Sequence, residues 1–154
     1  MTILVLSDSH GELDNMVGAV ERTQPDRIFH LGDGWRDAEK LASKYPEIPM
    51  EQVPGNCDLG RPEKAEKLVK LEGLRLLLCH GHTQYVKSNL SILTRTAQER
   101  SADAALFGHT HRPFVDMRAG IALLNPGSIG PYGRPSYGIL QLWEGKCLPS
   151  TFYL

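Results

Sequence analysis

Five short segments combine glycine with side chains that commonly bind metal ions or take part in catalysis. Each follows an apolar stretch; they are Asp8-Ser9-His10-Gly11, Gly32-Asp33-Gly34, Gly55-Asn56-Cys57-Asp58, His80-Gly81-His82 and Gly108-His109-Thr110-His111. Any one segment is equally well explained as a polar turn. All five together are harder to explain so, because carboxylates and imidazoles gathered in a protein interior are costly unless a cation neutralises them. We therefore predict one metal site to which all five contribute.

The ligand types in these segments narrow the choice of metal. They occur in pairs two residues apart, which in an extended chain places both side chains on the same side: Asp8 and His10, His80 and His82, His109 and His111. Oxygen and imidazole ligands without thiolate favour Mn²⁺, Fe, Zn²⁺, Ni²⁺ or Mg²⁺. The remaining histidine, His30, lies inside an apolar strand. We interpret it as a buried histidine that supports the site rather than as a ligand.

The first third of the chain alternates between strand and helix patterns. Apolar runs predict strands at 2–6, 27–31 and 48–53, and residues 13–20 and 38–45 have the spacing of amphipathic helices. A β-α-β-α-β order implies right-handed crossovers and a largely parallel sheet. Ligands in such folds collect beyond the carboxyl ends of the strands, so the polar segments are expected to converge there.

The second half of the chain is dominated by hairpins. Turns with glycine where positive φ is favoured are expected at Glu72-Gly73, Arg118-Ala119-Gly120 and Glu144-Gly145. One further helix is predicted at about 89–100, capped by Ser88 or Asn89, followed by a buried strand from 104. Parallel units followed by hairpins predict two mixed sheets packed together and covered by helices, in a single domain spanning 1–154.

Composition excludes several classes of partner. The 154 residues carry a formal charge of −1 without lysine and arginine clusters, so no nucleic-acid-binding face is predicted. No stretch approaches the ~20 apolar residues of a membrane span, and the N-terminus lacks a signal-peptide pattern. Three separated cysteines without a CxxC pair favour a reducing compartment, and we predict a cytoplasmic location. The sequence leaves monomer and homo-oligomer both open.

The ordered set DSH, GDG, GNCD, HGH and GHTH resembles the calcineurin-like metallophosphoesterase superfamily. With Asn125-Pro126-Gly127-Ser128, which by itself reads as a tight turn, the chain is most similar to small prokaryotic phosphodiesterases of the YfcE type. The resemblance implies a metallo-dependent phosphatase-like fold, a four-layer α/β/β/α sandwich of two mixed β-sheets. It also implies two divalent metal ions, with manganese favoured. One ion would be held by Asp8, His10, Asp33 and His111, and the other by Asp33, Asn56, His80 and His109.

The resemblance further implies hydrolysis of a phosphate ester, most simply a small phosphodiester. A hydroxide shared by the two ions would attack phosphorus while Asn56 contacts substrate and stabilises charge. His82 is expected to serve both catalysis and substrate binding, and Arg112 to bind substrate. Many relatives carry histidine where this chain has Cys57. Because a thiol is a poorer proton donor near neutrality, we hypothesise that aryl diesters react faster than alkyl diesters; Cys57 as a mere small residue is the alternative.

Two competing functions are compatible with parts of the pattern. A non-catalytic scaffold on the same fold, like the phosphoesterase-fold subunit of retromer, would be expected to lose metal ligands, whereas all seven positions here keep ligand-type residues. A binuclear hydrolase of the metallo-β-lactamase type would need an HxHxDH cluster, and the chain continues after His82 with Thr83-Gln84 instead. The phosphoesterase interpretation is therefore favoured.

Overall fold

The structure is a computed structural model that describes residues 1–61 and 63–154. Among the described residues, the strands form two five-stranded sheets, in the orders β10-β9-β1-β2-β3 and β4-β5-β6-β8-β7. The elements run in the order β1 (Thr2–Leu6), α1 (Leu13–Thr23), β2 (Arg27–His30), α2 (Trp35–Lys44), β3 (Met50–Gln52), β4 (Glu66–Leu71), β5 (Leu74–Cys79), α3 (Ser91–Glu99), β6 (Ala104–Leu106), β7 (Pro113–Arg118), β8 (Ile121–Pro126), β9 (Ser136–Trp143) and β10 (Lys146–Tyr153).

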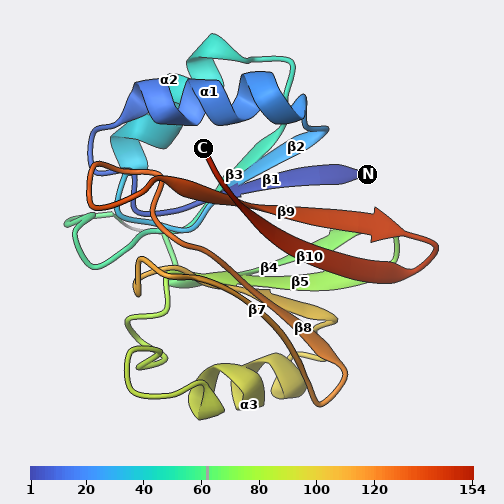
Figure 1. Ribbon diagram of the computed structural model, residues 1–154. Coiled ribbons are helices and arrows are strands. Elements are labelled where there is room, and N and C mark those ends of the chain that lie inside the picture. The colour runs from blue at the N-terminus through green and yellow to red at the C-terminus, as the bar shows by residue number, and fades with distance from the viewer. Residues whose placement is uncertain (62) are drawn as a thin grey trace.

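Figure 1 shows four layers, and three hydrophobic clusters hold them together. The central cluster joins the facing sides of the two sheets, with Val5 and Phe29 from one sheet against Leu78 and Leu106 from the other. A second cluster packs α1 and α2 on the outer face of the first sheet. A third packs α3 on the outer face of the second sheet. The predicted α/β/β/α sandwich of two mixed sheets is confirmed.

Each sheet contains three neighbouring parallel strands, and this places the polar segments at one edge of the molecule. Strand β1 pairs parallel with β2, and β2 with β3, whereas β9 and β10 add antiparallel strands. In the other sheet β5, β6 and β8 are parallel neighbours. The loops that follow β1, β2, β5 and β6 therefore leave the sheets on the same side, the left side of Figure 1.

The three predicted hairpins are confirmed. Both central residues of each turn have positive φ, from 48° to 76°, which is the type I′ geometry that matches strand twist: Glu72-Gly73, Ala119-Gly120 and Glu144-Gly145. Helix α3 begins two residues later than predicted. The Asn89 side chain nevertheless accepts a hydrogen bond from the Ser91 amide at 3.0 Å. Within the described residues, no helix is both long and apolar enough to cross a membrane.

Candidate metal centre

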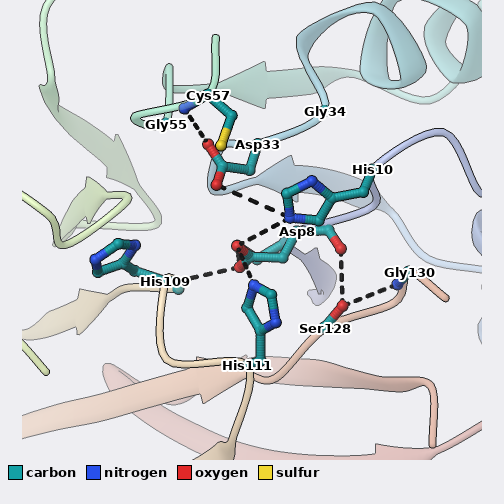
Figure 2. Close-up of polar contacts among 12 residues, drawn as sticks. Asp8, His10, Asp33, Gly34, Gly55, Cys57, His109, His111, Ser128 and Gly130 are labelled. Atoms are coloured by element: carbon teal, nitrogen blue, oxygen red, sulfur yellow. Dashed lines mark hydrogen bonds and ion pairs between the residues drawn. The ribbon is translucent and has the colours of Figure 1, made fainter. Parts of the chain in front are cut away.

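One oxygen of the Asp8 carboxylate accepts hydrogen bonds, and the other is turned toward imidazoles, of which Figure 2 shows His10 and His111. Its Oδ2 accepts hydrogen bonds from Ser7 Oγ at 2.5 Å and from the His109 amide at 3.1 Å. Its Oδ1 lies 3.1 Å from His111 Nε2, and 3.8 Å and 3.9 Å from the Nε2 atoms of His10 and His80. Because Asp8 is fully buried, Oδ1 is fixed at the centre of the cluster.

The two oxygens of Asp33 also have different partners. Its Oδ1 accepts a hydrogen bond from the Cys57 amide at 2.8 Å, and its Oδ2 lies 3.4 Å from His80 Nε2 and 3.9 Å from His10 Nε2. In Figure 2 the imidazole of His10 lies between the two carboxylates. The two acids thus present one oxygen each to a shared space bordered by histidines.

The orientation of His80 is set by the neighbouring strand. Its Nδ1 lies 2.7 Å from the carbonyl oxygen of Leu31, so Nδ1 carries the proton and donates it. In the neutral ring, which is the form that ligates metals, the Nε2 lone pair faces the carboxylates. In the protonated ring Nε2–H points at Asp33 Oδ2 instead. His109 Nδ1 lies 3.1 Å from His80 Nε2. Two overlapping groups therefore come within metal-ligand spacing: Asp8, His10 and His111, and Asp8, Asp33 and His80.

The backbone at the centre is left-handed, which corrects the reasoning from extended-chain spacing. Five of the predicted ligands have φ between 43° and 70°: Asp8, His10, Asp33, His109 and His111. Non-glycine residues in this region cost on the order of 1–3 kcal/mol each and gather at functional sites. The paired residues do lie at one site, but tight turns rather than extended strands bring their side chains together.

Asp58 holds two of the site loops together through four backbone amides. Its Oδ2 accepts hydrogen bonds from Asp33 N at 2.7 Å and Gly55 N at 2.8 Å, and its Oδ1 from Gly34 N at 3.2 Å and Trp35 N at 3.0 Å. A Cβ added at Gly55 would collide with Asp33 Oδ1, so glycine is required for this close approach. Asp58 thereby fixes the loop that presents Asp33.

A second buried chain of hydrogen bonds anchors the loop after β1. His30 is fully buried, as predicted, and its Nδ1 accepts from the Gly32 amide at 3.2 Å. Its Nε2 therefore donates to Ser9 Oγ at 3.0 Å, and Ser9 Oγ donates to Asp37 Oδ2 at 2.7 Å. The same Asp37 oxygen accepts from the Gly11 amide at 2.8 Å. The two residues flanking His10 are thus held by α2.

The Asn125–Ser128 segment ties the loops to β8. Ser128 Oγ donates to the Asp8 carbonyl at 2.8 Å and accepts from the Gly130 amide at 3.1 Å, as Figure 2 shows. The Asn125 side chain donates to the Gly108 carbonyl at 2.9 Å and to Thr110 Oγ1 at 3.0 Å. The segment does turn, with Gly127 at a φ of 76°. It also supports both the β1 and the β6 loops.

The electrostatics of the cluster suit a cation. Burial by itself would raise the pKa of the Asp33 carboxyl, but the hydrogen bond and charge of His80 and the Cys57 amide hold it well below its usual range. Burial opposes protonation of His80, yet Asp33 and Asp8 raise its pKa. The Nε2 atom of His10 is buried and has no hydrogen-bond partner among the residues that the structure describes. A buried nitrogen aimed at two carboxylates fits a metal ligand, because a cation would satisfy all three groups.

The remaining predicted site residues lie around this cluster. His82 is half-buried, with its ring centroid 5.4 Å from that of His80, and burial lowers its pKa. Asn56 is exposed, and its amide nitrogen lies 3.6 Å from Cys57 Sγ. Cys57 itself is exposed beside a hollow of about 380 Å³ that His10 and Asp33 also line. Arg112 is exposed and lines a different hollow, beyond the His109–His111 turn.

Comparison with known proteins agrees with this geometry. A family profile described as the calcineurin-like phosphoesterase superfamily domain matches residues 1–145. The chain belongs to this superfamily. The probable metallophosphoesterase YsnB of Bacillus subtilis (strain 168) is 34% identical, over 99% of this chain and 90% of its own length.

Two solved structures extend the comparison with this superfamily. YfcE, a phosphoesterase from E. coli, is 26% identical with a TM-score of 0.68, over 92% of this chain and 88% of its own. Vps29 from Chaetomium thermophilum has a TM-score of 0.78, covering 100% of this chain and 95% of its own. At 17% identity the likeness to Vps29 is one of fold.

Sequence reasoning missed three residues that contact the predicted ligands or their loops. Asp37 and Asp58 bind backbone amides, which no side-chain motif reveals, although an acid in a helix's first turn and the acid ending the GNCD segment were visible. Tyr132 stacks on His111 at 5.9 Å between ring centroids and meets His10 edge-on at 5.2 Å. Its loop carried no ligand-type signal.

Proposed function

We propose that this chain is a phosphodiesterase that uses two divalent metal ions. One observation carries the proposal: the groups Asp8, His10, His111 and Asp8, Asp33, His80 overlap, and in the described part of the chain the buried His10 Nε2 has no hydrogen-bond partner. When bound, the ions would neutralise phosphate charge and lower the pKa of a water held between them. Membership of a metal-dependent phosphoesterase superfamily supports this chemistry.

The proposed ligand sets are those implied by the family pattern, with manganese as the favoured ion. Asp8, His10, Asp33 and His111 would hold one ion, and Asp33, Asn56, His80 and His109 the other. Asp33 Oδ2 faces both His10 and His80, while Oδ1 is engaged by the Cys57 amide. Oδ2 is therefore the Asp33 oxygen that would be free to hold the ions.

The other side chains would handle the phosphate and its leaving group. Asn56 and His82 are assigned to the non-bridging oxygens. Burial, together with the charge and hydrogen bond of Asp33, raises the pKa of the Cys57 thiol. A protonated thiol is a weak hydrogen-bond donor, so substrates with good leaving groups are favoured. The three cysteines are free thiols, which supports a reducing, cytoplasmic location.

The test combines metal analysis with a matched pair of variants. We expect the purified protein to contain a divalent transition metal, to lose turnover of bis(p-nitrophenyl) phosphate on chelation and to regain it with Mn²⁺. Asp33→Asn should abolish turnover. Asp116→Asn, the same change at an exposed residue paired with Arg118, should leave turnover intact. Equal activity of the two variants would refute the proposal.

The leaving-group hypothesis needs its own comparison. Cys57→His should raise kcat/KM for an alkyl methyl diester at least about tenfold relative to an aryl one, because an imidazole can protonate the alkoxide. Comparable kcat/KM values of wild type for alkyl and aryl diesters would refute the role of Cys57.

A second candidate is a scaffold without turnover, favoured by the fold shared with Vps29. This function predicts a metal-loaded protein that is inert toward a panel of phosphodiesters, monoesters and pyrophosphates. Hydrolysis of any of them at rates that depend on Asp33 would exclude it.

A further inference from the structure

The turn that carries His109 and His111 lies between the metal centre and a second hollow. The His109 amide and the His111 imidazole contact Asp8, whereas Thr110 and Arg112 line a separate hollow of about 560 Å³ on the side of α3. The Asn125 side chain holds this turn in place by donating a hydrogen bond to the Thr110 hydroxyl. Helix α3 begins at the same edge of the molecule as the site loops (Figure 1). The hollow is therefore a direct neighbour of the metal centre.

The floor of the hollow is apolar and partly aromatic. Phe107 and Phe114 meet edge to face with ring centroids 6.3 Å apart, and Val86 and Leu90 also contribute. Phe107 is buried and packs in the core between α3 and its sheet, so the floor of the hollow is rigid. The volume lies within the range of roughly 300–1,000 Å³ found for small-molecule sites. Such a surface suits a flat ring, which can stack or pack edge-on against phenylalanine.

The rim of the hollow is cationic. Lys87 and Arg112 are the charged side chains among its lining residues, which include no acid. Two exposed cations over an apolar floor complement a ligand that is flat, apolar and negatively charged at its far end.

We propose that this hollow is a subsite for one arm of the phosphodiester, and that it takes an aromatic group bearing an anionic substituent. This assignment rests on the proposed function, since the phosphate must lie at the metal centre for its arm to cross the 109–111 turn. The substrate class is then a diester with an anionic aryl or similar ring on one side. The phenylalanines would bind the ring, and Lys87 and Arg112 its charge.

The experiment compares methyl 2-naphthyl phosphate with methyl 6-carboxy-2-naphthyl phosphate. In each protein the ratio of the two kcat/KM values cancels changes in metal loading or folding. Lys87→Glu should lower the ratio of carboxylated to plain substrate about three- to tenfold, because an ion pair at a partly exposed site is replaced by repulsion. The matched control is Lys146→Glu, at a hollow bordered by Asp103 and Leu148, and should keep the wild-type ratio.

A binding measurement separates this inference from the proposed function. Fluorescence titration of the metal-free protein with 6-hydroxy-2-naphthoate should give a Kd that Lys87→Glu weakens about three- to tenfold and Lys146→Glu does not. Binding that depends on Lys87 without diester turnover would support the subsite's ligand chemistry and overturn the phosphodiesterase proposal. Turnover and binding that are both indifferent to Lys87→Glu would overturn the subsite and leave the phosphodiesterase proposal standing.

Discussion

Asp58 offers a test of how the metal centre is held together, because one half-buried carboxylate serves four backbone amides. In Asp58→Asn the remaining carbonyl oxygen can serve one pair of amides, while the new NH₂ group faces the other pair. Gly34, which precedes α2, makes no side-chain cap of its own, so the helix also loses the anion at its positive end.

The expected loss of stability follows from this count. Each amide left without a partner costs about 1–3 kcal/mol, and water reaching the half-buried side chain offsets part of the cost for the two amides concerned. We therefore expect a loss of about 2–4 kcal/mol. For a chain of this length 1 kcal/mol shifts Tm by about 2–4 °C, so the metal-free variant should melt roughly 5–15 °C below wild type.

The assay is thermal unfolding in excess chelator, followed by circular dichroism. The matched control is Asp26→Asn, which removes an exposed acid that accepts a single backbone hydrogen bond, from Thr2 N at 2.7 Å. It should shift Tm by less than half as much. If Asp58 instead acted mainly as an acid partner of Cys57, Asp58→Asn would lose turnover but would have about the same Tm as Asp26→Asn. That result would refute the structural role of Asp58 in holding the two site loops together.

Three further predictions follow from the same contacts. Divalent metal should raise the Tm of the wild type but not of Asp33→Asn in a melting series with added Mn²⁺, because only the folded state gathers the ligands. Because burial lowers the pKa of His30 to about 4, its contribution to stability is complete above pH 6.5 and falls by up to about 3 kcal/mol as pH drops toward 4; His30→Gln should flatten that part of a Tm-against-pH curve. Tyr132→Ala should weaken metal binding about two- to tenfold by calorimetry while Tyr132→Phe keeps it, since the ring supports His10 and His111; equal affinities would exclude this role.

The layers and hairpins were predictable because their signals are local. The apolar run Thr2–Leu6 and the turn Glu72-Gly73 depend on neighbouring residues alone, and the structure reproduces both. Helix α2 was predicted three residues too short at its start, because Trp35 begins the helix under a cap that Asp58 supplies from 23 positions away. No local pattern could indicate that contact.

The convergence of the ligand residues was predictable from topology, whereas their orientation was not. A parallel sheet brings the loops after Leu6 and His30 to one edge whatever their sequence. Which carboxylate oxygen faces the centre depends on amides contributed by distant loops, such as Cys57 N on Asp33 Oδ1. Coordinates were therefore needed to learn that Oδ2 of Asp33 is the oxygen that faces His10 and His80.

Many hydrogen bonds hold the backbone of the loops around the metal centre. They are needed because, without metal, the site contains buried acids and unfavourable left-handed residues. Asp8 and Asp33 are held as buried acids beside a partnerless His10 nitrogen, on turns whose left-handed residues are each unfavourable. A chain free to relax would separate these groups and leave the left-handed region. Asp58, Asp37 and Ser128 oppose this by bonding the loop backbones rather than the ligands, so the ligand atoms keep lone pairs for a cation. Replacing one of these three residues should therefore disorder the loops of the metal centre, whereas the chemistry of each ligand side chain should stay the same.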